Sequence, residues 1–279
     1  MNRKQCKLIA AAIAARDYLK AIELIDAALS TKGIGVHWKR DLTKLKAFLA
    51  DGVARFSIFA KQGNVKLPFL SFSSVPGAGF CIGAGDCLNW CYSFRAWRYP
   101  AAFSRQIQNS VLLQSASGRT KILEALDKFK PASGALDFRL YVDGDFTGVA
   151  DIAFWMDALT VRPWLKAYGY SKSWESFLDY TGTVPFNYQL NLSSGSKYGD
   201  EVKDKLKGAD YVRGEFKAVS VGYTVKSKDH GDRAHQKKLR EVYGSKAFTC
   251  PGLCGSCTKS GHACGSDRFK GVDIIIAVH

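Results

Sequence analysis

Seven of the eight cysteines in this 279-residue chain fall into two compact groups, each set among glycines. The first cysteine group is Cys81, Cys87 and Cys91, and the second cysteine group is Cys250, Cys254, Cys257 and Cys264. Glycine allows the left-handed backbone turns that let several thiolates on one loop point to a common centre. The clustering therefore indicates metal or iron–sulfur chemistry, whereas the isolated Cys6 is expected to be a plain thiol.

The first cysteine group, spaced C-x5-C-x3-C, supplies three ligands for a four-coordinate centre. A cluster held by three thiolates keeps one iron open to a substrate, a cofactor or water. Trp90 and Tyr92 flank Cys91 and can shield such a cluster from solvent. We favour a [4Fe-4S] cluster here. The alternative is a zinc site of three cysteines completed by a histidine, of which His37 is the nearest in sequence.

The second cysteine group, spaced C-x3-C-x2-C-x6-C, is a complete set of four ligands. Its short Cys-x2-Cys spacing suits both zinc and an iron–sulfur cluster, so spacing leaves both open. His262 lies inside the group and can replace one sulfur. We therefore expect one or two [4Fe-4S] clusters, with zinc as the alternative, and a joint site that draws thiols from both groups is a further possibility.

The remaining composition bears on location and partners. The basic, alanine-rich N-terminus is soon broken by Arg16, Asp17 and Lys20 and shows no cleavage site, so we expect no signal peptide. A cytoplasmic protein follows, in which clustered cysteines are more often metal ligands than disulfides. The apolar runs are shorter than the ~18 residues of a membrane span, so no membrane partner is expected.

The net charge of +15 predicts attraction to polyanions. Basic residues are densest at positions 226–240. This stretch is either a solvated surface or a contact for nucleic acid or a small anionic cofactor. No motif identifies a small-molecule substrate.

The periodicity predicts an α/β protein. Residues 1–50 show helical spacing and are expected to form an N-terminal helical extension. Residues 51–279 alternate strand and helix patterns, which favours a (β/α) TIM-like barrel, complete or partly open, carrying both cysteine groups. The expected strands are residues 54–61, 137–142, 165–170, 186–192, 216–223, 247–249 and 273–278, and the expected helices between them are 100–114, 120–130, 148–159, 173–180, 198–206 and 232–243.

The loops after parallel strands share one face, so the polar residues there are candidate site residues. Asp143 and Asp145 flank a glycine and are candidates for general acid–base catalysis or cofactor binding, or alternatively for capping the turn. Ser171, Ser193 and Ser194 follow later strands, where hydroxyls and helix amides can bind an anion.

Arginines near the first cysteine group can balance its charge. Arg95 and Arg98 lie shortly after Cys91 and can offset thiolate charge or hold a carboxylate or phosphate of a cofactor. Arg139 lies on an expected strand and can pair with an acid inside the barrel.

From about residue 75 to the C-terminus, the sequence resembles the phage and plasmid gene product 88 family. The resemblance rests on the first cysteine group with Tyr92, Asn109, Arg139 with Asp143-Gly144-Asp145-Phe146, Tyr170-Ser171-Lys172-Ser173, the second cysteine group and a terminal strand ending in His279. That family brings no settled activity with it.

A more distant resemblance is to radical S-adenosylmethionine enzymes. In those enzymes a three-cysteine loop after the first barrel strand holds a [4Fe-4S] cluster, with an aromatic residue before the last cysteine, as Trp90 stands here. The resemblance implies that Asp143-Gly144-Asp145 and the serines at 193–196 contact S-adenosylmethionine. The spacing C-x5-C-x3-C departs from the usual C-x3-C-x2-C of that family.

Two functions are therefore weighed. The first is a cytosolic iron–sulfur protein, acting as a radical-SAM-like or redox enzyme of a phage or plasmid. The alternative is a zinc-stabilised, nucleic-acid-binding protein of a mobile element without catalytic activity.

Overall fold

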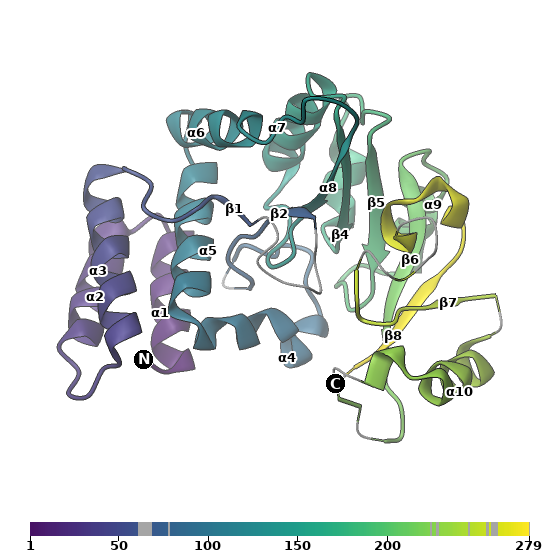
Figure 1. Ribbon diagram of the computed structural model, residues 1–279, viewed down its shortest axis with the longest axis horizontal. Coiled ribbons are helices and arrows are strands. Elements are labelled where there is room, and N and C mark those ends of the chain that lie inside the picture. Colours follow the sequence, from purple (N-terminus) through teal and green to yellow (C-terminus); the bar gives the residue numbers. More distant parts are fainter. Residues whose placement is uncertain are drawn as a thin grey trace.

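The structure is a computed structural model that describes residues 1–60, 69–77, 79–223, 225–226, 229–244, 246–254, 257 and 262–278. These residues form a mixed α/β fold around an eight-stranded sheet with the order β1-β2-β3-β4-β5-β6-β8-β7 (Figure 1). The strands are β1 (Phe59–Ala60), β2 (Leu70–Phe72), β3 (Leu136–Leu140), β4 (Leu165–Ser171), β5 (Tyr188–Ser193), β6 (Val212–Val219), β7 (Phe248–Thr249) and β8 (Ile274–Ala277). Only the β1–β2 pair is antiparallel, and the other strand pairs are parallel.

The α/β class is confirmed, but a closed barrel is wrong. The sheet is open, with β1 and β7 as its two edges. The expected first strand at 54–61 is reduced to β1 among the described residues, and it runs antiparallel. The strand that leads to the first cysteine group is β2, which the sequence did not predict because it has three residues and no detectable alternation.

Three helices make up the N-terminal stretch: α1 (Arg3–Ala14), α2 (Tyr18–Leu29) and α3 (Val36–Asp51). Asn2 and Gln5 form a capping box at the start of α1. At the end of α3, Gly52 adopts a left-handed conformation with φ 69°. The three helices contribute to the same main hydrophobic core as the sheet, so they are joined to it by burial as well as by the chain. A domain boundary near residue 50 stays a prediction.

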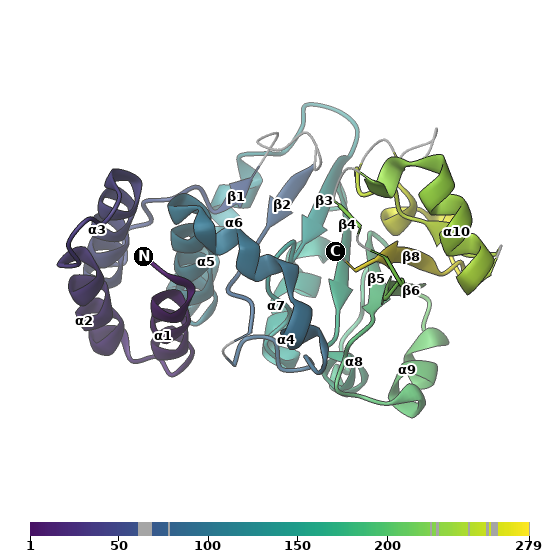
Figure 2. The ribbon, with the colours of Figure 1, turned by 90° about the horizontal axis from the view of Figure 1, so that it is seen from below.

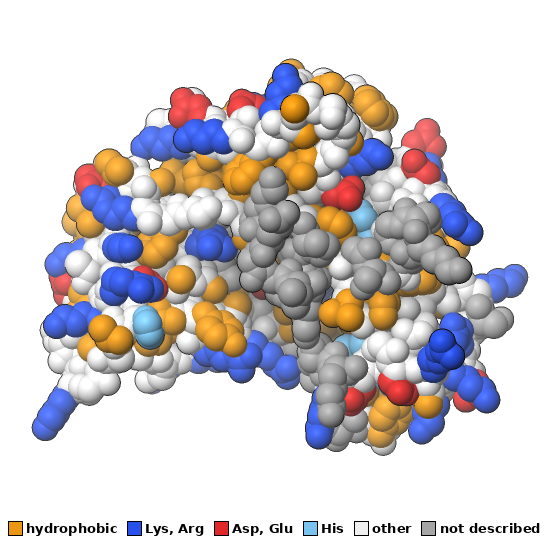
Figure 3. Space-filling view, viewed as in Figure 1, with side chains coloured by type: hydrophobic (Ala, Val, Ile, Leu, Met, Phe, Trp, Pro, Cys, Tyr) orange, Lys and Arg blue, Asp and Glu red, His pale blue; other side chains and the backbone are white. Residues whose placement is uncertain are grey.

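The remaining α-helices are α4 (Cys87–Trp90), α5 (Pro100–Leu113), α6 (Ala116–Asp127), α7 (Val149–Thr160), α8 (Trp174–Asp179), α9 (Asp200–Lys207) and α10 (Arg233–Tyr243). Viewed from below, the N-terminal helices and α10 lie at opposite ends of the molecule (Figure 2). Lys and Arg side chains are spread over the face seen in Figure 3, with several over α10. Among the described helices, none has both the length and the apolar character that crossing a membrane requires.

The two faces of the sheet have different neighbours. On one face, Trp155 of α7 packs against Phe138 of β3, and Phe177 of α8 stacks parallel to Tyr188 of β5. Successive strand residues point to opposite faces, so Arg139 points away from this packed side. The opposite face carries a smaller apolar cluster that includes Tyr168 and Cys264. The described residues of the second cysteine group that belong to this cluster, Cys250, Cys257 and Cys264, therefore pack on the face away from α7 and α8.

Helix α5 holds the irregular segments around β1 and β2 through buried polar side chains. Gln108 accepts hydrogen bonds from the backbone N–H groups of Arg55 and Phe56, at 2.7 and 2.9 Å. Asn109, one of the residues in the family resemblance, donates to the carbonyls of Ile58 and Ser73. Backbone that lacks sheet partners here is thus satisfied by side chains, which fixes where the chain enters the first cysteine loop.

Asp151 makes the stability of the fold depend on pH. Its carboxylate, in the first turn of α7, is buried and accepts from the hydroxyl of Tyr141 and the N–H of Thr147. Burial raises its pKa from 3.8 to about 6. Between these values the folded state binds a proton that the unfolded state releases, so stability falls as pH rises from about 4 to about 6, by roughly 2–3 kcal/mol.

Asp151→Asn keeps an acceptor oxygen and has no proton to lose, so we expect the difference in unfolding free energy between wild type and variant to change across this window. Urea denaturation at a series of pH values measures it. Asp157→Asn, which alters an exposed carboxylate on the same helix, is the control. A pH profile of Asp151→Asn parallel to that of the wild type would contradict the assignment.

Candidate metal centre in a thiol-lined cavity

A cavity of about 440 Å³ lies at the carboxyl ends of the parallel strands, over the sheet face away from α7 and α8. Its wall is formed by strand residues such as Arg139, Tyr170 and Phe216 and by the loops that follow the strands. All seven members of the two cysteine groups line it, while Cys6 lies elsewhere in α1. The expectation that thiols distant in sequence meet at one face is confirmed.

The first cysteine group lies on the loop after β2 and on the short helix α4. Cys81 accepts a hydrogen bond from the N–H of Gly77 at 3.2 Å. Burial raises the pKa of both Cys81 and Cys87, and the charges of Asp145 and Cys91 act in the same direction. The three thiols are therefore near enough to repel one another as thiolates, and a bound cation would offset that cost.

The loop after β5 fastens the first cysteine loop to the sheet. The carbonyl of Gly195 accepts from the N–H of Gly85 at 3.0 Å and from that of Cys87 at 3.3 Å. The carbonyl of Gly83 accepts from Lys197 N–H and from the Ser196 hydroxyl. The serine-rich turn found in the sequence thus has a structural role that spacing did not reveal: it positions Cys87.

Gly83, between Cys81 and Cys87, has no room for a side chain. A Cβ atom there would lie 1.8 Å from the carbonyl oxygen of Lys172, which is backbone and cannot swing away. We expect Gly83→Ala to displace the loop, lower the unfolding free energy by roughly 1–3 kcal/mol and reduce metal retention at the first cysteine group. Thermal denaturation and metal analysis measure both effects.

Gly199→Ala is the matched control, because a Cβ at Gly199 meets nothing within 4 Å. Equal stability and equal metal content in the two variants would show that the close approach at Gly83 is not needed.

Of the two aspartates after β3, Asp145 is buried and Asp143 half-buried, and both are hydrogen-bonded. Asp145 accepts from the Ser171 hydroxyl at 2.7 Å and from the N–H of Lys172 at 2.8 Å, and it lines the cavity. Asp143 accepts from the side-chain amide of Gln106 at 3.0 Å. Burial raises the pKa of both carboxyls, and their hydrogen bonds oppose that shift. The Asp145 contacts connect the loops after β3 and β4, whereas Asp143 is joined to α5. The catalytic or cofactor-binding role of the two aspartates stays a prediction.

The other candidate cofactor residues are divided between the cavity and its surroundings. Ser193 lines the cavity. Ser194 accepts from the N–H of Ala218 at 2.8 Å. Arg98 lies over the ring of Tyr99 at the end of the 3-10 helix η1 (Tyr92–Arg98), which also contains Arg95. Among the described residues that line the cavity, Ser171, Ser194, Arg95 and Arg98 do not occur.

Lys172 lines the cavity, but the sequence analysis named it only within the family resemblance and not as a site residue. Its ammonium group donates to Ser193 Oγ at 2.8 Å, and its charge lowers the pKa of Cys81 and Cys87. The signal available was its place directly after β4, beside Ser171. Tyr170, two positions earlier on the cavity face, was likewise missed.

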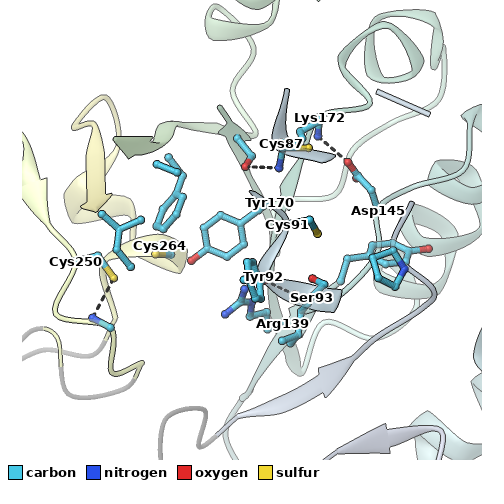
Figure 4. Close-up of a pocket in the computed structure, with 18 of the residues that line it drawn as sticks. Cys87, Cys91, Tyr92, Ser93, Arg139, Asp145, Tyr170, Lys172, Cys250 and Cys264 are labelled. Atoms are coloured by element: carbon cyan, nitrogen blue, oxygen red, sulfur yellow. Dashed lines mark hydrogen bonds between the residues drawn. The ribbon is translucent and has the colours of Figure 1, made fainter. Parts of the chain in front are cut away.

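The second cysteine group begins directly after β7 and ends in the 3-10 helix η3 (Ala263–Gly265). Cys250 accepts from the N–H of Gly252 and Cys257 from that of Ala263, both at 3.4 Å. Burial raises the pKa of Cys250 to about 12 and that of Cys264 to about 11, and the neighbouring thiols contribute. Figure 4 shows Cys250 and Cys264 across Tyr170 from Cys87 and Cys91.

Neither histidine considered as a zinc ligand has a suitable place. His262 lies in the cavity lining, but its Nδ1 accepts from the N–H of Gly265 at 3.2 Å and its Nε2 lies 3.5 Å from Asp137. Both ring nitrogens are thus engaged within the protein. His37 lies on α3, and the cavity lining does not include it.

All eight cysteines are free thiols. Within the described part of the chain, no three Cys, His, Asp or Glu side chains stand in position to hold one metal ion together. An iron–sulfur cluster requires a wider arrangement of ligands than a single ion. Each thiolate binds its own iron, and the cysteine sulfurs surround a core of several atoms. The donor set of one buried and two half-buried sulfurs, with an amide donor and a nearby lysine, fits such a group.

An open, mostly parallel sheet with a thiol-lined cavity at its carboxyl edge defines a cysteine-rich α/β protein with a candidate metal centre. The chain belongs to the gene product 88 family, whose family model matches residues 40–270. No curated protein and no solved structure matches it. The resemblance to this family is confirmed, but the match begins earlier than expected, within α3, and ends at residue 270, before the expected terminal strand at 273–278. The resemblance to radical S-adenosylmethionine enzymes is not shown by these comparisons.

Proposed function

We propose that this protein binds an iron–sulfur cluster, of the [4Fe-4S] type, through Cys81, Cys87 and Cys91. The observation that carries the proposal is the gathering of seven of the eight cysteines on one cavity. Buried thiols without a partner cation are costly as thiolates, and a cluster offsets that cost. Zinc is the alternative metal for the same sulfurs.

Three ligands leave one iron of the cluster free to meet a ligand inside the cavity. Around that position the cavity supplies the aromatic rings of Trp90 and Tyr170, the ammonium group of Lys172 and the hydroxyl of Ser193. Such a mixture of apolar walls and few polar groups is typical of small-molecule sites. We infer a redox or radical-SAM-like reaction, with S-adenosylmethionine as one candidate ligand of the open iron.

Purification without oxygen, followed by iron, sulfide and zinc analysis, tests the proposal. We expect a brown protein with iron and sulfide in equal amounts. Replacing a cysteine of the first cysteine group with alanine should remove part of the iron and part of the sulfide. Cys6→Ala, which changes the buried cysteine outside the cavity, should keep all of it. Zinc in stoichiometric amount with no iron, in both wild type and reconstituted protein, would reject the cluster.

Nucleic-acid binding is a second candidate function, supported by the net charge of +15 and by the basic surface of α10. Lys238 and Arg240 are exposed there. We expect DNA or RNA affinity to fall with salt, and Lys238→Glu with Arg240→Glu to flatten the logarithmic salt slope by about 0.9 per lost phosphate contact. Affinity no greater than that of an unrelated protein of equal charge would contradict this.

A further inference from the structure

Arg139 places a half-buried positive charge in the cavity that both cysteine groups line. Its guanidinium lies over the ring of Tyr170, 4.6 Å from the centroid, and its Nη1 lies 3.9 Å from Cys254 Sγ. Its Nε is buried and has no hydrogen-bond partner. Asp143 is close enough for its pKa to be lowered by Arg139, yet among the described residues no carboxylate forms an ion pair with this arginine. A guanidinium that is partly removed from water and whose buried Nε has no hydrogen-bond partner is stabilised by a nearby negative charge, so a counter-charge is expected beside it.

The four sulfurs of the second cysteine group each have a donor. Backbone N–H groups of Gly252 and Ala263 donate to Cys250 and Cys257. Arg139 lies at Cys254, and the Tyr170 hydroxyl forms a hydrogen bond with Cys264. A metal-bound thiolate can only accept hydrogen bonds, so a donor beside each sulfur suits a set of metal ligands.

The charges are complementary. Four thiolates around a [4Fe-4S] core keep an excess of negative charge, and Arg139 is a cation that contacts one of them, Cys254. Tyr92 and Tyr170 lie between this set and the first cysteine group (Figure 4). His262 is occupied by Gly265 and Asp137, so the four sulfurs form the complete ligand set.

We propose that Cys250, Cys254, Cys257 and Cys264 form a second, closed metal centre, and that Arg139 is its counter-charge. The second centre rests on the proposed function insofar as both groups bind metal as thiolates. It is separate from the open first centre and has no free coordination position. Arg139 is a positioning residue: it acts on the metal through the Cys254 sulfur and through Tyr170.

Arg139→Gln, Arg139→Lys and Cys250→Ala test the second centre. In each variant the metal and sulfide content, the rate of metal loss to a chelator and the midpoint potential are measured without oxygen. Cys250→Ala should lose the metal of the second centre and keep that of the first. Arg139→Gln should lower the metal affinity of the second centre about 10–100-fold and, if it holds a cluster, shift its potential to more negative values. Arg139→Lys, which keeps the charge, should restore most of both.

The outcomes separate this proposal from the one on which it rests. No metal in either group ends both proposals. Metal that is lost with Cys87→Ala but unchanged in Cys250→Ala overturns the second centre and leaves the first. Arg139→Gln with wild-type metal affinity and potential overturns the role of Arg139. Circular dichroism shows whether each variant is folded. If Arg139→Gln does not fold, Arg139→Lys is compared with the wild type instead.

Discussion

Cys87→Ala is expected to abolish metal binding at the first cysteine group while the fold survives. Cys87 begins α4, is buried at the cavity and lies within electrostatic range of Cys91 and Lys172. Two thiolates cannot hold a cluster that already lacks a fourth ligand. Alanine removes only the sulfur from a site whose backbone is held by Gly195, so we expect a small change in stability of the metal-free protein.

Iron and sulfide analysis, with visible absorbance, measures the loss, and Cys6→Ala is the control for the removal of a buried sulfur. Wild-type iron content in Cys87→Ala would show that this cysteine is not a ligand.

Arg213→Met is expected to give the largest loss of stability. This arginine on β6 is buried, and its guanidinium donates to the carbonyls of Phe269 and Val272 at 2.9 and 2.6 Å. It also donates to Asn191, whose side-chain amide donates to the carbonyl of Cys264 at 2.9 Å. Each buried carbonyl left without its donor costs about 1–3 kcal/mol, so we expect a loss of roughly 3 kcal/mol or more in unfolding free energy.

The same change should loosen the segment that carries Cys264 and raise the rate of metal loss from the second cysteine group. Urea denaturation measures the stability, and Lys166→Met, at an exposed position on β4, is the control with an expected change within about 0.5 kcal/mol. A loss for Arg213→Met as small as that of the control would contradict this role.

The sequence predicted the individual strands better than it predicted whether the sheet closes into a barrel. Each expected strand from 137–142 onward corresponds to one of the strands β3 to β8, because alternation and flanking turn residues are local signals. Whether a sheet closes depends on pairing between its first and last strands, which no local pattern records. Strand β2 has three residues, too few to show alternation. Because β2 was missed, the antiparallel pairing of β1 with β2 at the edge of the sheet was missed too.

The candidate site was predicted in part for the same reason. Cysteine spacing made the seven thiols visible, and the rule that loops after parallel strands share one face brought them together. Lys172 was not recognised as a site residue, because a single lysine in a basic chain has no distinguishing spacing. The buried polar residues of α5, such as Gln106 and Gln108, look like a solvent face in sequence, but they satisfy irregular backbone and hold Asp143.

Mössbauer spectroscopy of protein loaded with isotopically enriched iron, kept away from oxygen, tests the central claim most directly. We predict quadrupole doublets of a [4Fe-4S] cluster, with one iron of the first centre altered when a small ligand is added, and loss of that signal in Cys87→Ala. A spectrum showing only loosely bound iron, identical in Cys87→Ala and Cys6→Ala, would contradict the assignment of these sulfurs as cluster ligands.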